Sequence, residues 1–300
     1  MKTLSTTFLF FLFVLTGISL AEEPFEVSRN ISYDDDHAEA QRLDCYLAKS
    51  DKPVPVMIYI HGGGWRAGSK DRIPEFLARA VREGWLSVIS VEYRFTDVAI
   101  HPAQVNDCAR AIQFTRSKAK EWNIDPDKIG VCGGSAGGHL SLWLALHDDL
   151  ANPESDDPIE RESSRVTCAI SFAGPTDWNL LSTLRHDHPA YRQLIGYEPG
   201  TSVDKMDVAR MTDVSPVSFA SQDDPPVLLV HGDGDVIVPV EHSRDLDRKL
   251  DQVGARSELF LVPGGNHSVA GAGGLQVMDR STAFVREHLL GEKQTLIWKK

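Results

Sequence analysis

The chain has 300 residues, of which 42% are hydrophobic and 25% are charged, which is ordinary for a soluble globular protein. That length suits one large domain or two small ones. A net charge of −12, with no compensating cluster of lysine, arginine and aromatic residues, argues against nucleic-acid binding.

Residues 1–21 have the layout of a secretory signal peptide. A lysine precedes the apolar run from Phe8 to Val14, and small residues stand at the −3 and −1 positions ahead of Glu22. The run is too short and too poorly flanked for a typical membrane span, although an uncleaved N-terminal anchor is an alternative. We therefore expect an exported protein, periplasmic or secreted, whose folded domain covers residues 22–300. After cleavage, no stable membrane association is expected.

Short β-rich runs alternate with helical patterns along the rest of the chain. The predicted strands are residues 26–32, 42–48, 54–60, 86–91, 129–132, 166–172, 227–230 and 257–261. The predicted helices are residues 73–83, 104–122, 136–146, 240–253 and 274–289. Strands joined by helical crossovers favour an α/β fold: a mostly parallel, eight-stranded, doubly wound sheet with helices on both faces and an antiparallel start.

Two stretches interrupt this alternation. Residues 148–165 carry seven acidic residues against two arginines, which predicts an exposed, mobile loop. Residues 176–222 form a stretch that is too long for a simple connection between a helix and a strand, and it contains helical fragments of its own. We expect this second stretch to form a small cap or lid.

The chain contains four cysteines, which are Cys45, Cys108, Cys132 and Cys168. An exported protein can form disulfides. However, these residues are widely spread, three of them lie in apolar runs, and a domain of this size needs no covalent cross-link. We favour buried free thiols, and disulfides remain the alternative.

The pentapeptide Gly133-Gly134-Ser135-Ala136-Gly137 lies between a predicted strand and a predicted helix. A serine at such a turn has a strained backbone and is exposed at the carboxyl edge of the sheet. Gly133 and Gly137 must lack side chains because strand and helix approach closely. The helix N-terminus also favours developing negative charge. The pattern indicates Ser135 as a nucleophile, with a structural glycine turn as the alternative.

The segment His61-Gly62-Gly63-Gly64-Trp65 directly follows the buried strand predicted at residues 54–60. Glycines at this place leave backbone N–H groups uncovered and able to bind a tetrahedral oxyanion. We expect Gly63, Gly64 and Ala136 to supply the donors. A flexible turn is the alternative.

An acid and a base follow in the order that a serine triad requires. Asp233 and Asp235 come after the strand predicted at residues 227–230, and we favour Asp235 as the acid, with Asp233 as a turn or cap residue. His267 comes after the strand predicted at residues 257–261. A loop histidine there is placed to accept the serine proton.

Several other residues deserve a prediction. Trp65 and Tyr93 follow strand ends and are candidates to bind substrate, as is Trp178, with core packing as the alternative. His139 lies one helical turn past Ser135, and we expect it to pack or to donate a hydrogen bond. None of the cysteines has metal-ligand spacing. Asp34-Asp35-Asp36-His37 and His186-Asp187-His188 are possible cation sites, but we favour solvated polar stretches and expect no metal.

These motifs carry a family resemblance. They are His61 to Trp65, Glu92-Tyr93-Arg94, Asp125-Pro126, Gly133 to Leu140, His231-Gly232 with Asp235 and Pro239, and Gly265 with His267. The sequence resembles the exported α/β-hydrolase esterases related to hormone-sensitive lipase and to the feruloyl/acetyl-xylan esterase branch. The resemblance implies hydrolysis of small ester groups, often acetyl or aryl groups on plant or algal polysaccharides, with no cofactor.

The sequence thus predicts a carboxylesterase in which Ser135 attacks the ester, His267 is the base and Asp235 orients it. Its expected partner is a small-molecule or oligosaccharide ester, and acetyl and propionyl esters should react faster than esters of long fatty acids. One alternative is amide cleavage by the same triad, as in an arylformamidase or a prolyl peptidase. The other is a non-catalytic binding module of the hydrolase fold. Such modules usually lack a triad residue, whereas every triad position is filled in this sequence.

Overall fold

The computed structural model of the protein describes residues 24–34, 39–183 and 188–293. The predicted signal peptide lies outside the described residues. Within them, no helix is both long enough and apolar enough to cross a membrane.

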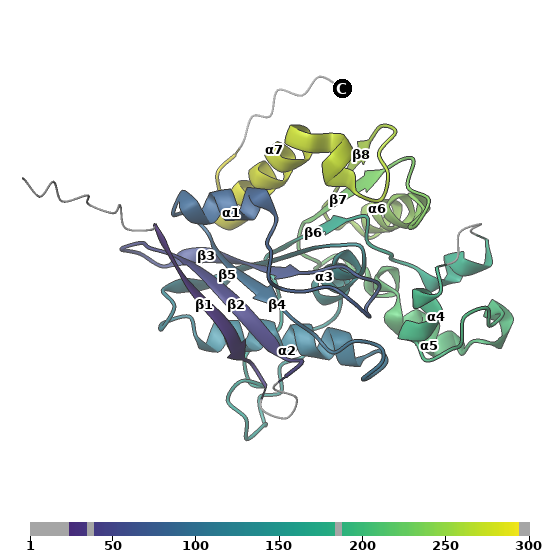
Figure 1. The fold of residues 1–300 in the computed structure, drawn as a ribbon, viewed down its shortest axis with the longest axis horizontal. Helices are drawn as coiled ribbons and strands as arrows, with labels where there is room; N and C mark the ends of the chain where they lie inside the picture. The colour runs from purple at the N-terminus through teal and green to yellow at the C-terminus, as the bar shows by residue number, and fades with distance from the viewer. Residues whose placement is uncertain (1–23, 35–38, 184–187, 294–300) are drawn as a thin grey trace, which may run out of the picture.

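Eight strands of the described chain form a single sheet (Figure 1). They are β1 (Phe25–Ser32), β2 (Arg42–Ala48), β3 (Val54–Ile60), β4 (Ser87–Val91), β5 (Ile124–Gly134), β6 (Cys168–Phe172), β7 (Val227–Gly232) and β8 (Ser257–Val262). Their order across the sheet is β1-β2-β4-β3-β5-β6-β7-β8. β2 pairs antiparallel with β1 and with β4, and the other neighbours are parallel. This confirms the predicted sheet with its antiparallel start.

Helices cover both faces of the sheet. One face packs against α1 (Glu75–Arg82) and α7 (Val269–Leu290), which contribute Leu77 and Phe284 to the same apolar cluster. The helices α2 (Ala103–Ser117), α3 (Ala136–Leu146) and α6 (Glu241–Val253) pack on the other face (Figure 1). β3 is buried along almost its whole length, which explains its continuous apolar sequence.

The described part of the stretch between β6 and β7 contains five short helices. They are η1 (Trp178–Ser182), α4 (Ala190–Leu194), η2 (Val203–Lys205), α5 (Val208–Val214) and η3 (Pro216–Phe219), of which η1, η2 and η3 are 3₁₀ helices. This confirms the helical fragments expected in residues 176–222. The Trp178 side chain holds the stretch together: it is fully buried, and its Nε1 donates to the carbonyl of Tyr191 at 3.0 Å.

The main error in the predicted boundaries falls between α2 and β5. The helix ends at Ser117, and turns follow as far as Asn123, which takes a left-handed conformation with φ of 51°. β5 then begins at Ile124, five residues before the predicted strand.

The acidic loop at residues 148–165 is anchored to α2, contrary to the expectation of a mobile loop. Arg110 forms an ion pair with Asp157 at 2.5 Å, and Arg116 donates to the carbonyl of Arg165 at 2.8 Å. Within the loop, Asp149 accepts the backbone N–H of Ser164 at 2.8 Å. The acidic side chains therefore order the loop as well as solvate it.

All four cysteines are buried and free, as predicted. They lie in the sheet and in α2, where each packs as a small apolar side chain. Burial raises the pKa of the Cys168 thiol to about 12, so this thiol stays neutral and unreactive near neutral pH.

Candidate active site

Ser135 stands at the turn between β5 and α3. Its backbone has φ of 54° and ψ of −120°, a strained conformation for a residue with a side chain. The turn is held from both sides: the N–H of Ser135 donates to the carbonyl of Phe172 at 2.7 Å, and its own carbonyl accepts from His139 at 3.0 Å. The serine thus lies at the N-terminus of α3, as the motif predicts.

The glycines around Ser135 are required by close backbone approach. A Cβ atom on Gly137 would lie 2.0 Å from the carbonyl oxygen of Ile60 in β3. A Cβ on Gly133 would lie 2.5 Å from the backbone of Gly137. Since no real contact is that short, any side chain at either position would push α3 away from the sheet and displace the serine.

Asp235 and His267 meet at the ends of the two neighbouring strands β7 and β8. The Nδ1 of His267 lies 2.7 Å from the Oδ2 of Asp235. Asp233 lies elsewhere: its exposed carboxylate accepts the backbone N–H of Gly264 at 2.6 Å. Of the two aspartates weighed from the sequence, Asp235 is the one that contacts the histidine, and Asp233 stabilises a turn.

The Asp235 side chain is completely buried and receives four donors. Its Oδ1 accepts the backbone N–H groups of Ile237 at 2.8 Å and Val238 at 3.0 Å. Its Oδ2 faces His267 and also the Nε2 of His231 at 3.3 Å. Burial alone would raise the pKa of Asp235, but these hydrogen bonds outweigh it and hold the pKa well below the ordinary 3.8. Asp235 therefore stays ionised.

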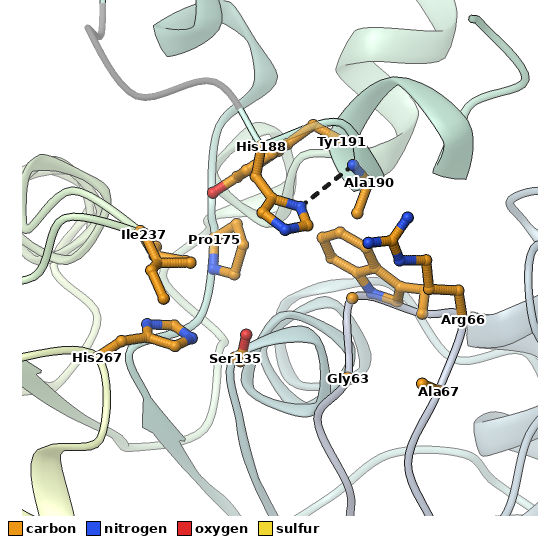
Figure 2. A pocket seen from close by; sticks show the side chains of 13 residues that line it. Gly63, Arg66, Ala67, Ser135, Pro175, His188, Ala190, Tyr191, Ile237 and His267 are labelled. Carbon is orange, nitrogen blue, oxygen red and sulfur yellow. Dashed lines mark hydrogen bonds between the residues drawn. The ribbon is translucent and has the colours of Figure 1, made fainter. Parts of the chain in front are cut away.

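Ser135 and His267 line the same cavity, which has a volume of about 420 Å³. In Figure 2 the imidazole of His267 points toward the Ser135 side chain, with Ile237 and Pro175 beside them. The imidazole thus contacts the carboxylate of Asp235 and faces the cavity that Ser135 also lines. The structure brings all three predicted triad residues together.

The glycine loop after β3 borders this cavity. Gly63 and Gly64 have positive φ of 121° and 61°, which suit glycine, and the Gly63 carbonyl accepts from Ala67 at 3.1 Å to close a tight turn. Within the described chain, no hydrogen bond uses the N–H groups of Gly63 or Gly64. Ala136 adds a further N–H at the first position of α3. These N–H groups are available to an oxyanion.

His61 and Tyr93 brace the glycine loop. The Nε2 of His61 lies 2.8 Å from the Glu92 carboxylate, and its ring stacks on Tyr93 with centroids 4.6 Å apart. The Tyr93 hydroxyl donates to the carbonyl of His61 at 3.1 Å. Tyr93 is only 1% exposed and lines neither cavity that contains Ser135. Its predicted role in binding substrate is therefore wrong: Tyr93 supports the loop from the core.

Trp65 does line the cavity, from a position packed on the core. Its ring centroid lies 5.7 Å from that of Trp178, which is fully buried. Its Nε1 donates to the Nδ1 of His139 at 3.1 Å, and the Nε2 of His139 donates to the carbonyl of Val214 at 2.8 Å. Burial lowers the pKa of His139 to about 3, so this histidine is a neutral bridge, as expected of a packing residue.

Comparison with known proteins places this site in a family. The model of the family described as BD-FAE matches residues 43–250. The chain belongs to the BD-FAE family.

Curated relatives of this family member are named as esterases. The chain is similar to a probable carboxylic ester hydrolase, LipM, of Mycobacterium tuberculosis, with 30% identity over 69% of this chain and 47% of the relative. It is also 30% identical to the esterase LipC of the same organism, over 80% of this chain and 59% of that relative. The chain thus spans about half the length of these curated relatives.

Solved structures of similar length share the fold. A truncated carbohydrate esterase from gut microbiota matches with a TM-score of 0.78 and 29% identity, over 90% of this chain and 99% of that chain. An acetyl ester-xyloside bifunctional hydrolase from Caldicellulosiruptor lactoaceticus matches with a TM-score of 0.74 and 27% identity, over 87% and 96%. These matches confirm the predicted α/β-hydrolase fold and its esterase family.

Several residues of the BD-FAE site were not predicted from the sequence. Arg66, His188 and Tyr191 line the cavity, the last two from the stretch between β6 and β7 (Figure 2). Tyr191 belongs to no recognised motif. His188 belongs to a polar stretch that is typical of a solvated loop. His231 is a motif residue, but its contact with Asp235 depends on how β7 and the following loop pack.

One group of described residues has donors close enough for a metal ion, and it lies away from the serine. Glu258, Glu287 and His288 have ligand atoms within 4.8 Å of one another. However, Glu258 is paired with Arg280, and Glu287 with Arg256 at 2.7 Å. Because arginines already neutralise both carboxylates, we assign no metal to this group.

Proposed function

We propose that the protein is a serine carboxylesterase acting on short-chain or aryl esters, with O-acetyl or feruloyl groups of carbohydrates as its natural substrate class. The observation that carries the proposal is the 2.7 Å contact of Asp235 with His267, whose ring points to Ser135 within one cavity (Figure 2). The names of the relatives support ester hydrolysis, and those of the structural neighbours support a carbohydrate ester.

In the proposed reaction, the hydroxyl of Ser135 attacks the ester carbonyl while the Nε2 of His267 takes its proton. Asp235 fixes the proton of the histidine on Nδ1 and stabilises the imidazolium. The N–H groups of Gly63, Gly64 and Ala136 bind the oxyanion.

The tetrahedral intermediate then breaks its bond to the alcohol oxygen, and that oxygen leaves with the proton from His267. An acyl group remains on Ser135. Water, deprotonated by His267, attacks this acyl-enzyme, and the carboxylic acid leaves as the serine regains its proton. The chemistry needs an ester and water as its reactants.

We further propose that the protein acts outside the cytoplasm. The support is the signal-peptide pattern of residues 1–21. Expression of the full chain followed by N-terminal sequencing of the exported protein would test it, with a mature N-terminus at Glu22 as the expected result.

The test of the activity is hydrolysis of 4-nitrophenyl acetate and of an acetylated xylo-oligosaccharide by the purified protein and by Ser135→Ala. We expect the substitution to remove activity on both esters and to leave the thermal unfolding temperature close to that of the parent. An equal rate on a peptide anilide would favour an amidase. Residual esterase activity within tenfold of the parent would exclude Ser135 as the nucleophile.

A further inference from the structure

A second cavity contains Ser135 and His267, and it lies between α1 and α7. Its volume is about 520 Å³, within the range of roughly 300–1,000 Å³ that is common for small-molecule sites. Its walls include Tyr59 of β3, Phe76 of α1, and Val277 and Met278 of α7, together with Phe172 and Val269. We call this cavity, defined by those six residues and the serine–histidine pair, the α1–α7 chamber.

The α1–α7 chamber is apolar and rich in aromatic rings. The rings of Phe76 and Phe172 have centroids 6.0 Å apart, and Tyr59 supplies a third ring. Among its described lining residues, Glu75 is the one carboxylate, and it is exposed and paired with Arg82. Burial raises the pKa of Tyr59 to about 12, so its hydroxyl is neutral. Such walls suit an uncharged, apolar group.

The first cavity also has apolar walls, among them Trp65, Tyr191 and Ile237, but it includes two basic side chains. Arg66 and His188 line it together with the glycine loop. Arg66 also lines a neighbouring cavity of about 410 Å³, whose other walls include the polar side chains of Asp97, Gln193 and Glu198. The Nη1 of Arg66 donates to Gln193 at 3.2 Å. Arg66 therefore lies between the first cavity and a set of polar side chains, and these suit an alcohol with many hydroxyl groups.

The chemistry of the ester requires two binding regions. When Ser135 has attacked, the former carbonyl carbon carries the serine oxygen, the oxyanion, the alcohol oxygen and the acyl substituent. Because the oxyanion needs the glycine loop and the alcohol oxygen needs His267, the acyl substituent must occupy separate space beside the serine. Of the two cavities that contain the serine, the α1–α7 chamber is the more apolar, and it meets this condition.

We propose that the α1–α7 chamber receives the acyl group of the substrate, up to the size of an aromatic acyl group, and that Phe76, Val277 and Met278 set its upper size. The sugar alcohol occupies the cavity lined by Arg66. This assignment rests on the proposed esterase function, and it names the part of the site that selects the acyl group.

The test compares 4-nitrophenyl acetate with 4-nitrophenyl cinnamate, which share one leaving group and differ in the acyl group. Met278→Trp places a larger side chain in the chamber. It should lower the ratio of kcat/KM for cinnamate to that for acetate by about tenfold, as expected for steric exclusion from an apolar pocket. Val277→Ala enlarges the chamber and should raise the same ratio.

The matched control is Leu275→Trp, which makes a comparable change on the same helix at a side chain that is 75% exposed. It should leave both rates unchanged. The assignment is overturned if Met278→Trp and Leu275→Trp give the same ratio, or if the parent cleaves acetate but not cinnamate. Failure to hydrolyse any ester would instead refute the proposed function, and the assignment with it. Thermal unfolding of each variant identifies a loss caused by misfolding, in which case Val277→Ala decides.

Discussion

Replacing Asp235 by asparagine tests the triad at its least exposed member. The substitution keeps the shape of the side chain but turns one acceptor into an NH₂ donor. The Oδ1 position accepts backbone N–H groups from Ile237 at 2.8 Å and Val238 at 3.0 Å. An amide NH₂ there would face both donors and leave them unsatisfied, at a cost of about 1–3 kcal/mol for the buried N–H of Val238. The asparagine oxygen therefore takes this position.

In that orientation the NH₂ group points at His267, where the parent has a carboxylate oxygen at 2.7 Å. The Nδ1 of His267 must then accept a hydrogen bond instead of donating one, so the ring proton moves to Nε2 and faces Ser135. A histidine in this tautomer cannot take the serine proton. The known effect of this change in serine triads is about 10⁴ in kcat, or about 5 kcal/mol of transition-state stabilisation.

The assay is kcat for 4-nitrophenyl acetate at saturating substrate, with Asp233→Asn as the matched control. Asp233 is exposed, and an amide oxygen can still accept the N–H of Gly264 at the same position. We expect the control to stay within about threefold of the parent, as surface substitutions usually do. The reasoning is refuted if Asp235→Asn loses less than tenfold, or if Asp233→Asn loses more than Asp235→Asn.

Two further predictions concern pH and acyl length. His139 and His242 are buried, and burial lowers the pKa of each to about 3, whereas an unfolded histidine titrates near 6.5. Below pH 6.5 these histidines therefore bind protons in the unfolded chain but not in the folded chain. As the pH falls from 6.5 to 4, the free energy of unfolding should decrease by up to about 1.4 kcal/mol per pH unit for each histidine. Urea denaturation should show a shallower pH slope for His139→Gln, and an unchanged slope would contradict the assignment. Across 4-nitrophenyl esters of two to sixteen carbons, acetyl and propionyl esters should have higher kcat/KM than long chains, because the sequence of residues 176–222 is largely polar and Phe76, Val277 and Met278 limit the α1–α7 chamber. A maximum at ten carbons or more would overturn this preference.

The sequence predicted most of the fold because its strands are strongly apolar and its helices are bounded by clear turns. β3 is an example: its continuous apolar run is buried on both faces, as such a run indicates. The end of α2 was predicted too late because helical spacing continues past Ser117. In the structure a series of turns replaces the helix from Lys118 to Asn123, and the residue pattern alone does not specify where helix gives way to turn.

The candidate triad was predictable because each member follows a strand end, and parallel strands bring those ends to one edge of the sheet. The walls of the site were not. Tyr93 also follows a strand end, yet its ring packs inward against His61, since position along a strand does not reveal which neighbour a side chain meets. The α1–α7 chamber depends on helices that are almost 200 residues apart in the chain, and no local pattern encodes their packing. The motif therefore predicts the reaction, while the substrate selectivity depends on long-range packing that appears only in the folded structure.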